Sequence, residues 1–338
     1  MKRPLGVALI GVAVIAALTG AGVHWATQSL DEPALMPGPL IYRVPSHAGF
    51  GQVAADLKAR GVLQHPRILT LYARYRGVAA QIKAGEYSID PHVTPRKLLQ
   101  QLIEGQVLLH SFTIVDGWQV RELLDAIRRS PDIHRTLPAS EADLMARFGS
   151  PRESPEGQFL PETYKFPAGT TDVEFLAIAH AALVKELSAD WADRDARVPV
   201  KTRQELLTLA SIVEKETALT SERAKIAGVY IQRLITGMRL QADPTVIYGL
   251  GDQYDGDIHT VDLRTDGPYN TYTRAGLPPT PIALAGAPAI RAAAKPEITG
   301  ALYFVASGLG DGSHVFSATL QEHNEAVARY LKRLRQRS

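Results

Sequence analysis

Two glutamates, Glu214 and Glu216, stand one lysine apart at the end of an apolar segment that predicts a helix over residues 203–218. On a helical wheel they fall on either side of the apolar stripe, so periodicity alone does not choose between them. A carboxyl that rests on apolar side chains keeps its proton to higher pH, because burial penalises the charged form. Such a group suits general acid catalysis near neutral pH.

The helical turn beneath each glutamate separates the two. The side chains one turn before Glu216 are all apolar: Leu209, Ile212 and Val213. Those before Glu214 include a hydroxyl and a small side chain: Leu207, Ala210 and Ser211. Glu216 is therefore the predicted general acid. The alternative is a solvated helix end with two ordinary glutamates.

The sequence lacks the residues and motifs that several other classes of reaction require. The chain contains no cysteine, which excludes disulfides, thiolate zinc sites and a cysteine nucleophile. It also lacks the H-E-x-x-H, P-loop and G-x-S-x-G patterns. The glycine-rich residues 308–314 predict a hairpin-type turn, and the aspartate-rich residues 249–257 predict a polar surface loop rather than a calcium site. We expect His314 and His323 to be structural, and we predict no metal and no cofactor.

The composition is that of a globular protein. Of 338 residues, 45% are apolar and 21% are charged, with a formal net charge of +2. Lys2 and Arg3 are the only charged residues before residue 27, so the rest of the chain is neutral. Because this remainder has no net positive charge, it has no electrostatic drive toward nucleic acid, and we predict no nucleic-acid partner.

The N-terminus predicts a membrane anchor. No charged residue occurs between residues 5 and 23, a length that roughly matches a bilayer core. We expect a transmembrane helix over residues 5–26 with residues 1–4 in the cytoplasm, since Lys2 and Arg3 favour the inner side. A cleaved signal peptide is the alternative, although its apolar part is normally shorter.

The remainder divides into four segments. Residues 27–40 are rich in proline and predict an extended tether. Residues 41–107 predict a small α+β module, and residues 108–155 a connecting α/β segment. Residues 156–338 predict a larger mixed α/β domain. The expected fold class is α+β after the transmembrane helix.

Capping residues and hydrophobic periodicity predict the individual elements. In the small module, Thr94 and Pro95 begin a helix that Gly105 ends. The other helices expected there cover residues 49–61 and 66–75, between strands at 41–45 and 83–89. After a strand near residues 108–115 and a helix at 119–130, we expect helices at about 172–188, 203–218, 221–236, 282–294 and 317–335, and a strand at 301–307.

Five long segments carry a resemblance to a known family: EGQFLPETYKFPAGTT, ASIVEKET, SERAKIAGVYIQRLITGMRLQADPTVIYG, PYNTYTRAGLPPTPIALAG and LYFVASGLGDGSHVFSATLQEHN. They resemble the MltG/YceG-like endolytic murein transglycosylases, in which an anchor, a LysM-like module and a catalytic domain follow in this order. The resemblance implies that residues 41–107 are LysM-like and that residues 156–338 are catalytic. It also implies that Glu216, the second acid of E-K-E-T, is the catalytic residue.

The resemblance implies cleavage of the β-1,4 bond between N-acetylmuramic acid and N-acetylglucosamine within glycan strands. A single carboxyl can donate a proton to the leaving oxygen and then accept one from the muramyl C6 hydroxyl, which leaves a 1,6-anhydro end. A hydrolase normally needs a second carboxylate. The alternatives are a muramidase-type hydrolase and a non-catalytic glycan-binding scaffold.

Polar residues of the resembling segments are candidates for sugar binding. Gln241 can bridge two hydroxyls or an N-acetyl group, and Asp243 either accepts from a hydroxyl or begins a turn. Asn270 offers a donor and an acceptor, and Tyr272, or else Tyr269, offers a face for a pyranose ring, unless this run is a plain strand.

Glu162 either orients Glu216 or caps the following turn.

The expected partners are peptidoglycan strands, the membrane, and the peptidoglycan synthases of elongation or division. The expected location is the bacterial inner membrane, single-pass, with the C-terminal domain on the cell-wall side.

Overall fold

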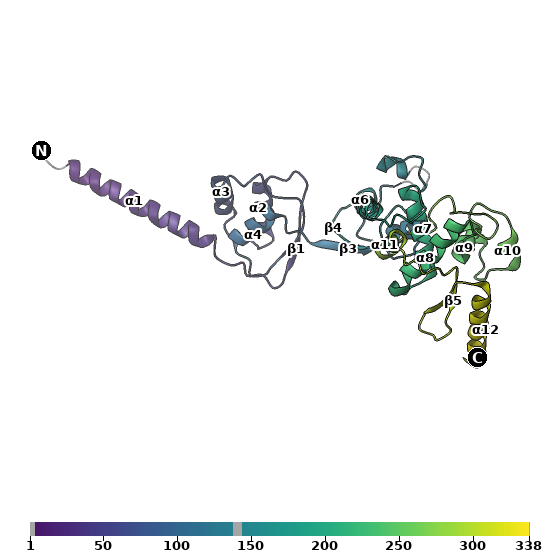
Figure 1. Ribbon diagram of the computed structural model, residues 1–338. Helices are drawn as coiled ribbons and strands as arrows, with labels where there is room; N and C mark the ends of the chain where they lie inside the picture. The colour runs from purple at the N-terminus through teal and green to yellow at the C-terminus, as the bar shows by residue number, and fades with distance from the viewer. Residues whose placement is uncertain (1–3, 138–143, 338) are drawn as a thin grey trace. The chain divides into compact units, whose positions relative to one another are not determined.

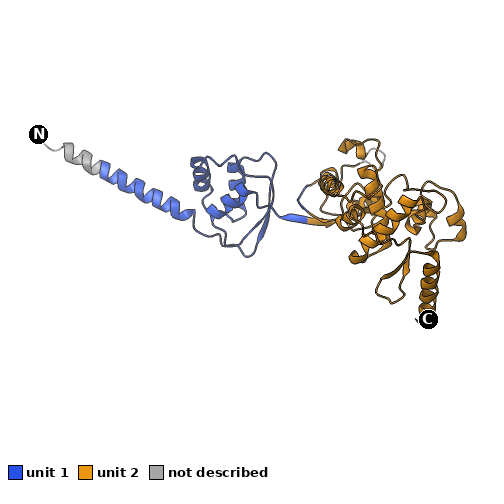
Figure 2. Cartoon of the chain, in the orientation of Figure 1, with its two compact units in different colours: residues 1–110, 165–169 blue, residues 111–164, 170–338 orange. Residues whose placement is uncertain are grey.

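The computed structural model describes residues 4–137 and 144–337, with side chains from residue 12 to residue 336. It divides into two compact units (Figure 2). Residues 1–110 and 165–169 belong to unit 1, and residues 111–164 and 170–338 belong to unit 2. Both units mix helices with short strands, as the expected α+β class requires.

The predicted anchor coincides with the first helix of unit 1, α1 (Pro4–Ser29). The side chains of residues 5–11, which the predicted anchor includes, lie outside the described residues. Among the residues that are described, no helix combines the length and the apolar composition that crossing a membrane requires.

The rest of unit 1 is a two-stranded sheet with three helices. Strand β1 (Leu40–Val44) pairs antiparallel with β2 (Gly85–Ile89), with Leu40 opposite Ile89. The helices, visible in Figure 1, are α2 (Phe50–Ala59), α3 (Pro66–Tyr75) and α4 (Pro95–Glu104). The elements expected over residues 41–107 are therefore confirmed in type and order.

Helix α4 shows why these elements were readable from the sequence. The side chain of Thr94 accepts a hydrogen bond from the backbone N–H of Lys97 at 3.3 Å. Pro95 takes the first turn, and Gly105 ends the helix in the left-handed conformation with φ 71°. Between these ends, Leu98, Leu99 and Leu102 face the core.

The predicted tether is not free over its whole length. Leu30 and Ala34 are buried in the core of unit 1. The backbone N–H groups of Ala34 and Met36 donate to carbonyls of the segment that precedes α4, at 2.9 and 3.2 Å. The prediction of an extended tether over residues 27–40 also missed that α1 continues to Ser29 and that turns follow it. The proline-rich composition did not reveal that apolar side chains pack this segment onto the small unit.

Unit 2 contains most of the helices. Its longer elements are α5 (Val120–Arg129), α6 (Asp172–Ala192), α7 (Arg203–Glu216), α8 (Thr220–Thr236), α9 (Asp243–Leu250), α11 (Ala287–Ala294) and α12 (Leu320–Arg337). Shorter pieces are η1 (Met145–Phe148), η2 (Gly251–Gln253) and α10 (Thr260–Arg264). Within unit 2, β5 (Tyr303–Ala306) pairs antiparallel with β6 (His314–Ser317) across the predicted hairpin turn. Strand β3 (Leu109–Thr113) pairs with β4 (Thr163–Pro167), and both strands include residues of each unit.

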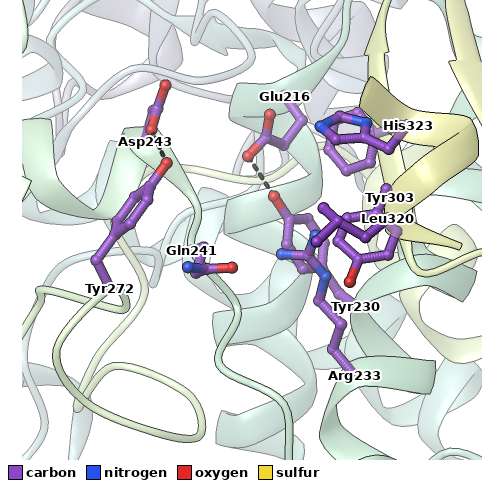
Figure 3. A pocket seen from close by; sticks show the side chains of 10 residues that line it. Glu216, Tyr230, Arg233, Gln241, Asp243, Tyr272, Tyr303, Leu320 and His323 are labelled. Atoms are coloured by element: carbon purple, nitrogen blue, oxygen red, sulfur yellow. Dashed lines mark hydrogen bonds between the residues drawn. The ribbon is translucent and has the colours of Figure 1, made fainter. Parts of the chain in front are cut away.

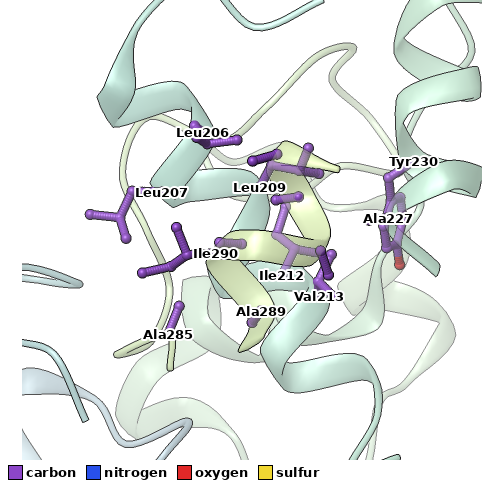
Figure 4. Packing of buried hydrophobic residues seen from close by; sticks show 14 of the residues in the cluster. Leu206, Leu207, Leu209, Ile212, Val213, Ala227, Tyr230, Ala285, Ala289 and Ile290 are labelled. Atoms are coloured by element: carbon purple, nitrogen blue, oxygen red, sulfur yellow. The ribbon is translucent and has the colours of Figure 1, made fainter. Parts of the chain in front are cut away.

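Helix α7 is the core helix of unit 2. It is buried from Leu206 to Glu214 without interruption, so its whole circumference and not only the predicted stripe is covered. Side chains of α8 and α11 pack around it, among them Ala227, Ala289 and Ile290 (Figure 4). At Gly228 of α8, an added Cβ would lie 2.1 Å from the carbonyl oxygen of Glu297, so only glycine allows this close approach.

Three expectations for unit 2 need correction. The helix expected over 282–294 begins only at Ala287, because the N–H groups of Ile282 and Leu284 donate to Ser211 Oγ and to the Trp118 carbonyl. Asp243 and the proline after it open helix α9 rather than a simple turn. The run at 268–273 forms turns and not a strand.

Candidate functional site

Glu216 is the last residue of α7. The next residue, Thr217, has an extended backbone with φ −148° and ψ 137°, so the helix ends at Glu216. The Glu216 carboxyl therefore lies at the edge of the apolar core. Helix α8 then packs against α7 and brings Tyr230 beside it. The Tyr230 hydroxyl donates a short hydrogen bond to Glu216 Oε1 (Figure 3).

The surroundings of Glu216 keep its proton bound. Burial raises the pKa of Glu216 to about 7, and the Tyr230 hydrogen bond opposes this shift because it stabilises the carboxylate. The negative charge of Asp243 also raises the pKa of Glu216, and the positive charge of Arg233 lowers it. Glu216 is therefore a carboxyl that can exist in both protonation states near neutral pH.

Glu216 opens onto a cavity of about 350 Å³ (Figure 3). The lining comes from α7, α8, the segment at 241–243, the loop around residue 272, strand β5 and helix α12. Its members are Glu216, Tyr230, Arg233, Gln241, Asp243, Tyr272, Tyr303, Phe304, Leu320 and His323. Four predicted site residues thus meet at one cavity: Glu216, Gln241, Asp243 and Tyr272.

The wall opposite Tyr230 carries a second carboxylate. Tyr272 donates a hydrogen bond to Asp243 Oδ1 at 2.5 Å, which fixes both side chains. Gln241 beside them has a backbone φ of +48°, a left-handed conformation that is costly for any residue with a Cβ. Its N–H donates to the Thr271 carbonyl at 3.1 Å, so contacts across this wall hold the conformation.

Glu214 has different surroundings from Glu216. Its Oε1 accepts from Arg223 at 2.7 Å and its Oε2 accepts from the N–H of Gly286 at 3.0 Å. Burial raises the pKa of Glu214, while the Gly286 hydrogen bond and the Arg223 charge lower it. With both oxygens bound inside the protein, Glu214 links α7 to α8 and to the start of α11.

Asn270 and Glu162 are not brought to this cavity. The Asn270 amide donates to the carbonyls of Asp262 and Thr265 at 2.9 and 2.7 Å, and its Oδ1 accepts from the Tyr272 N–H at 2.9 Å. Asn270 therefore shapes the loop that presents Tyr272. Glu162 is exposed, and its Oε1 accepts from the N–H of Thr163 at 3.1 Å. Thr163 begins strand β4, so this contact does not cap a turn.

The two histidines differ from each other. His314 agrees with the structural expectation, because its Nδ1 lies 2.7 Å from Glu222 Oε2. His323 does not: it lines the cavity, and in the described part of the chain its buried Nδ1 has no hydrogen-bond partner. Burial lowers the pKa of His323, and the nearby Arg233 lowers it further, so the ring is neutral at neutral pH.

The residues of α8, β5 and α12 that surround Glu216 were not predicted from the sequence. Arg233 donates from Nε to the Leu302 carbonyl at 2.7 Å and lies over the Tyr303 ring at 5.4 Å. Tyr303 in turn stacks with His323 at 5.2 Å. All of these residues lie in the five segments that resemble the family, and this resemblance could have indicated them. No hydrophobic periodicity or local motif distinguishes them as site residues.

The described residues contain no group of three or more histidine, aspartate or glutamate side chains placed to hold a metal ion. Glu216 supplies this cavity with a group that can transfer a proton near neutral pH. The side chains of Asp243, His323, Tyr272 and Tyr303 line the same cavity.

Comparison with known proteins identifies relatives over most of the chain. The YceG-like family model matches residues 42–329. A Bacillus subtilis (strain 168) protein named endolytic murein transglycosylase is 30% identical over 306 residues, which cover 85% of this chain and 84% of the relative. A Streptococcus pneumoniae (strain D39) protein of the same name is 26% identical over 329 residues, and the match spans 85% of this chain but 58% of that relative.

A solved structure agrees with these matches. The crystal structure of a YceG-like protein from Listeria monocytogenes superposes with a TM-score of 0.52 and 26% sequence identity. The match covers 85% of this chain and 98% of that chain.

Proposed function

The chain belongs to the YceG-like family, and from this premise we propose that it is an endolytic peptidoglycan lytic transglycosylase with Glu216 as its general acid and then base. The observation that carries the proposal is the half-buried carboxyl of Glu216, whose pKa is raised to about 7 at the wall of a cavity. The names of the relatives supply the substrate class, which is murein.

The proposed reaction needs one carboxyl and no cofactor. Protonated Glu216 donates its proton to the glycosidic oxygen, the bond from this oxygen to muramyl C1 breaks, and N-acetylglucosamine leaves with a free hydroxyl. The muramyl C6 hydroxyl then attacks C1, and the Glu216 carboxylate takes the hydroxyl proton. The enzyme regains its starting protonation state, and a 1,6-anhydro end forms without consuming water.

Asp243 is a second carboxyl at the cavity of Glu216, and its negative charge has a role of its own. Its negative charge raises the pKa of Glu216, and both side chains line the same cavity. In glycoside cleavage, an ionised carboxylate stabilises the positive charge that develops at C1. We assign this role to Asp243, with Gln241 and Tyr272 binding the sugar beside it.

The same pair of acids supports a second candidate function, muramidase-type hydrolysis. Hydrolytic enzymes use two carboxylates, one to protonate the leaving group and one to activate water or attack the sugar. Digestion of purified peptidoglycan in water labelled with heavy oxygen separates the two reactions. The proposal expects 1,6-anhydro ends without label; reducing muramyl ends that carry the label would establish hydrolysis instead. Glycan binding without either product would favour the scaffold.

The rate should depend on pH through Glu216. Only protonated Glu216 can start the reaction, so kcat/KM is expected to be flat below about pH 7 and to fall about tenfold per pH unit above it. A pH–rate profile on soluble glycan fragments measures this descent. A descent centred near 4.5, the ordinary value for glutamate, would contradict the role given to the burial of Glu216.

We also propose that residues 5–26 anchor the enzyme in the bacterial inner membrane as a single pass. The uncharged run from residue 5 to residue 23 after Lys2 and Arg3 supports this, and the positive-inside rule then sends the units to the cell-wall side. The full chain should remain with membranes after alkaline extraction, and a chain without residues 1–26 should not. Release of the full chain would refute the anchor.

Two finer roles follow from this placement. The small unit at 41–107 would act as a LysM-like glycan-binding module, and the enzyme would act on nascent strands beside the peptidoglycan synthases of elongation or division. Cross-linking in living cells tests the second role: adducts with synthases are expected, and adducts with unrelated envelope proteins only would refute it. Binding of glycan strands to the isolated membrane-free chain, with and without substitutions in the small unit, tests the first.

A further inference from the structure

The two oxygens of the Glu216 carboxyl have different surroundings. Oε1 accepts the hydrogen bond from Tyr230, whereas Oε2 makes no hydrogen bond with the described part of the chain. In Figure 3 the second oxygen points away from Tyr230. Because Glu216 ends its helix and Thr217 is extended, the backbone alone does little to fix which oxygen faces a substrate.

Tyr230 is a rigid donor. It is 1% exposed and lies within α8, and its ring packs edge to face with Phe304 at 6.0 Å and 89°. Burial raises the pKa of Tyr230 well above its usual range, and the neighbouring Glu216 charge raises it further, so the phenol keeps its proton throughout the working pH range. Its hydroxyl hydrogen is therefore always available to Oε1.

We propose that Tyr230 is a positioning residue that reserves Oε1 of Glu216, so that Oε2 alone delivers the proton to the substrate and later takes one back. This inference rests on the proposed function. In the acid form, a hydrogen on Oε1 would compete with the Tyr230 hydroxyl for the same oxygen, so the carboxyl proton resides on Oε2. In the base form, Tyr230 stabilises the negative charge on Oε1 and leaves Oε2 open to the substrate hydroxyl.

The groups that face Glu216 come from every element around it. They are Asp243 of α9, Arg233 of α8, Tyr272 of the loop between α10 and α11, Tyr303 of β5 and His323 of α12. Among the described residues, Tyr230 is the side chain that donates a hydrogen bond to the Glu216 carboxyl. Its hydroxyl is therefore the contact to remove.

The test compares Tyr230→Phe with Tyr164→Phe in the full chain. Tyr164 is a matched control, since it is also buried in unit 2, donates to the Leu160 carbonyl at 2.7 Å, and packs edge to face with Phe175 at 5.8 Å and 88°. Loss of a hydrogen bond to a charged group should lower kcat about tenfold in Tyr230→Phe with KM almost unchanged. Without this donor the carboxylate is less stable, so the alkaline descent of the rate should move up by about one pH unit. Tyr164→Phe should change neither quantity.

A second readout does not require activity. Carboxyl carbon NMR of protein labelled in glutamate, with Glu216→Gln to assign the signal, should show Glu216 titrating about one pH unit higher in Tyr230→Phe than in the wild type. Unchanged titration, or a rate loss with no movement of the descent, would overturn the inference and leave Tyr230 as a packing residue. If the wild-type enzyme forms no 1,6-anhydro ends, the proposed function fails, and the NMR titration still decides whether Tyr230 governs Glu216.

Discussion

Replacing Glu216 by glutamine is expected to lower the rate of strand cleavage about a hundred- to ten-thousandfold. Glutamine keeps the shape of the side chain, and its amide oxygen can still accept from Tyr230, but it has no proton to donate. The loss should therefore appear in kcat rather than in KM. Release of anhydro-ended fragments, quantified by mass spectrometry, measures it.

The same substitution should stabilise the fold at alkaline pH. The pKa of Glu216 is about 7 in the folded state against an ordinary 4.5, so the stability that this carboxyl contributes at low pH is lost as the pH rises from 4.5 to about 7. Glutamine has no such loss. Above pH 7 we expect the variant to be more stable by about 3 kcal/mol, and at low pH the difference should vanish.

The control for both effects is Glu325→Gln, an exposed glutamate of α12. It should retain the wild-type rate and the wild-type unfolding curve. Activity of Glu216→Gln equal to that of the wild type would exclude Glu216 as the acid and direct attention to Glu214 or Glu162.

Replacing Arg223 by methionine is expected to lower the free energy of unfolding, and this is the second large effect that we expect. The Arg223 and Glu214 side chains are 8% and 3% exposed and lie 2.7 Å apart, so the substitution leaves a buried carboxylate without its counter-ion. Breaking a buried pair in this way costs about 3–5 kcal/mol. Chemical denaturation measures the cost.

An exposed pair provides the matched control. Arg197 contacts Asp195 at 2.6 Å, but its side chain is 62% exposed, so Arg197→Met should cost less than about 1 kcal/mol. Adding Glu214→Gln to Arg223→Met should recover part of the lost stability, because the uncompensated charge is removed. Equal costs at Arg223 and Arg197 would contradict the structural role of the buried pair.

The local elements were predictable because their signals are local. Thr94, Pro95 and Gly105 act within one helix, and the predicted caps are the observed ones. The choice of Glu216 over Glu214 also used only the turn beneath each side chain. In the structure Glu214 is buried and Glu216 is half-buried. The two also differ in their contacts: both oxygens of Glu214 are bound by Arg223 and Gly286, whereas Glu216 lies beside an open cavity.

The remainder of the site depends on contacts between distant segments. Tyr230 reaches Glu216 only because α8 folds back on α7, and no periodicity marks one tyrosine of a buried helix as a donor. His323 comes from α12, about a hundred residues beyond Glu216. Asn270 was plausible as a sugar ligand by its chemistry, but the backbone of its own loop uses its amide.

The most direct test of the account is the titration of the Glu216 carboxyl in the wild-type protein. Carboxyl carbon NMR of glutamate-labelled full-length chain, assigned by the signal that disappears in Glu216→Gln, reports the protonation of this group without any assay of activity. We expect a midpoint at about pH 7, far from the ordinary 4.5. A midpoint near 4.5 would mean that Glu216 is ionised in the working enzyme, and would contradict its role as the acid that starts the reaction.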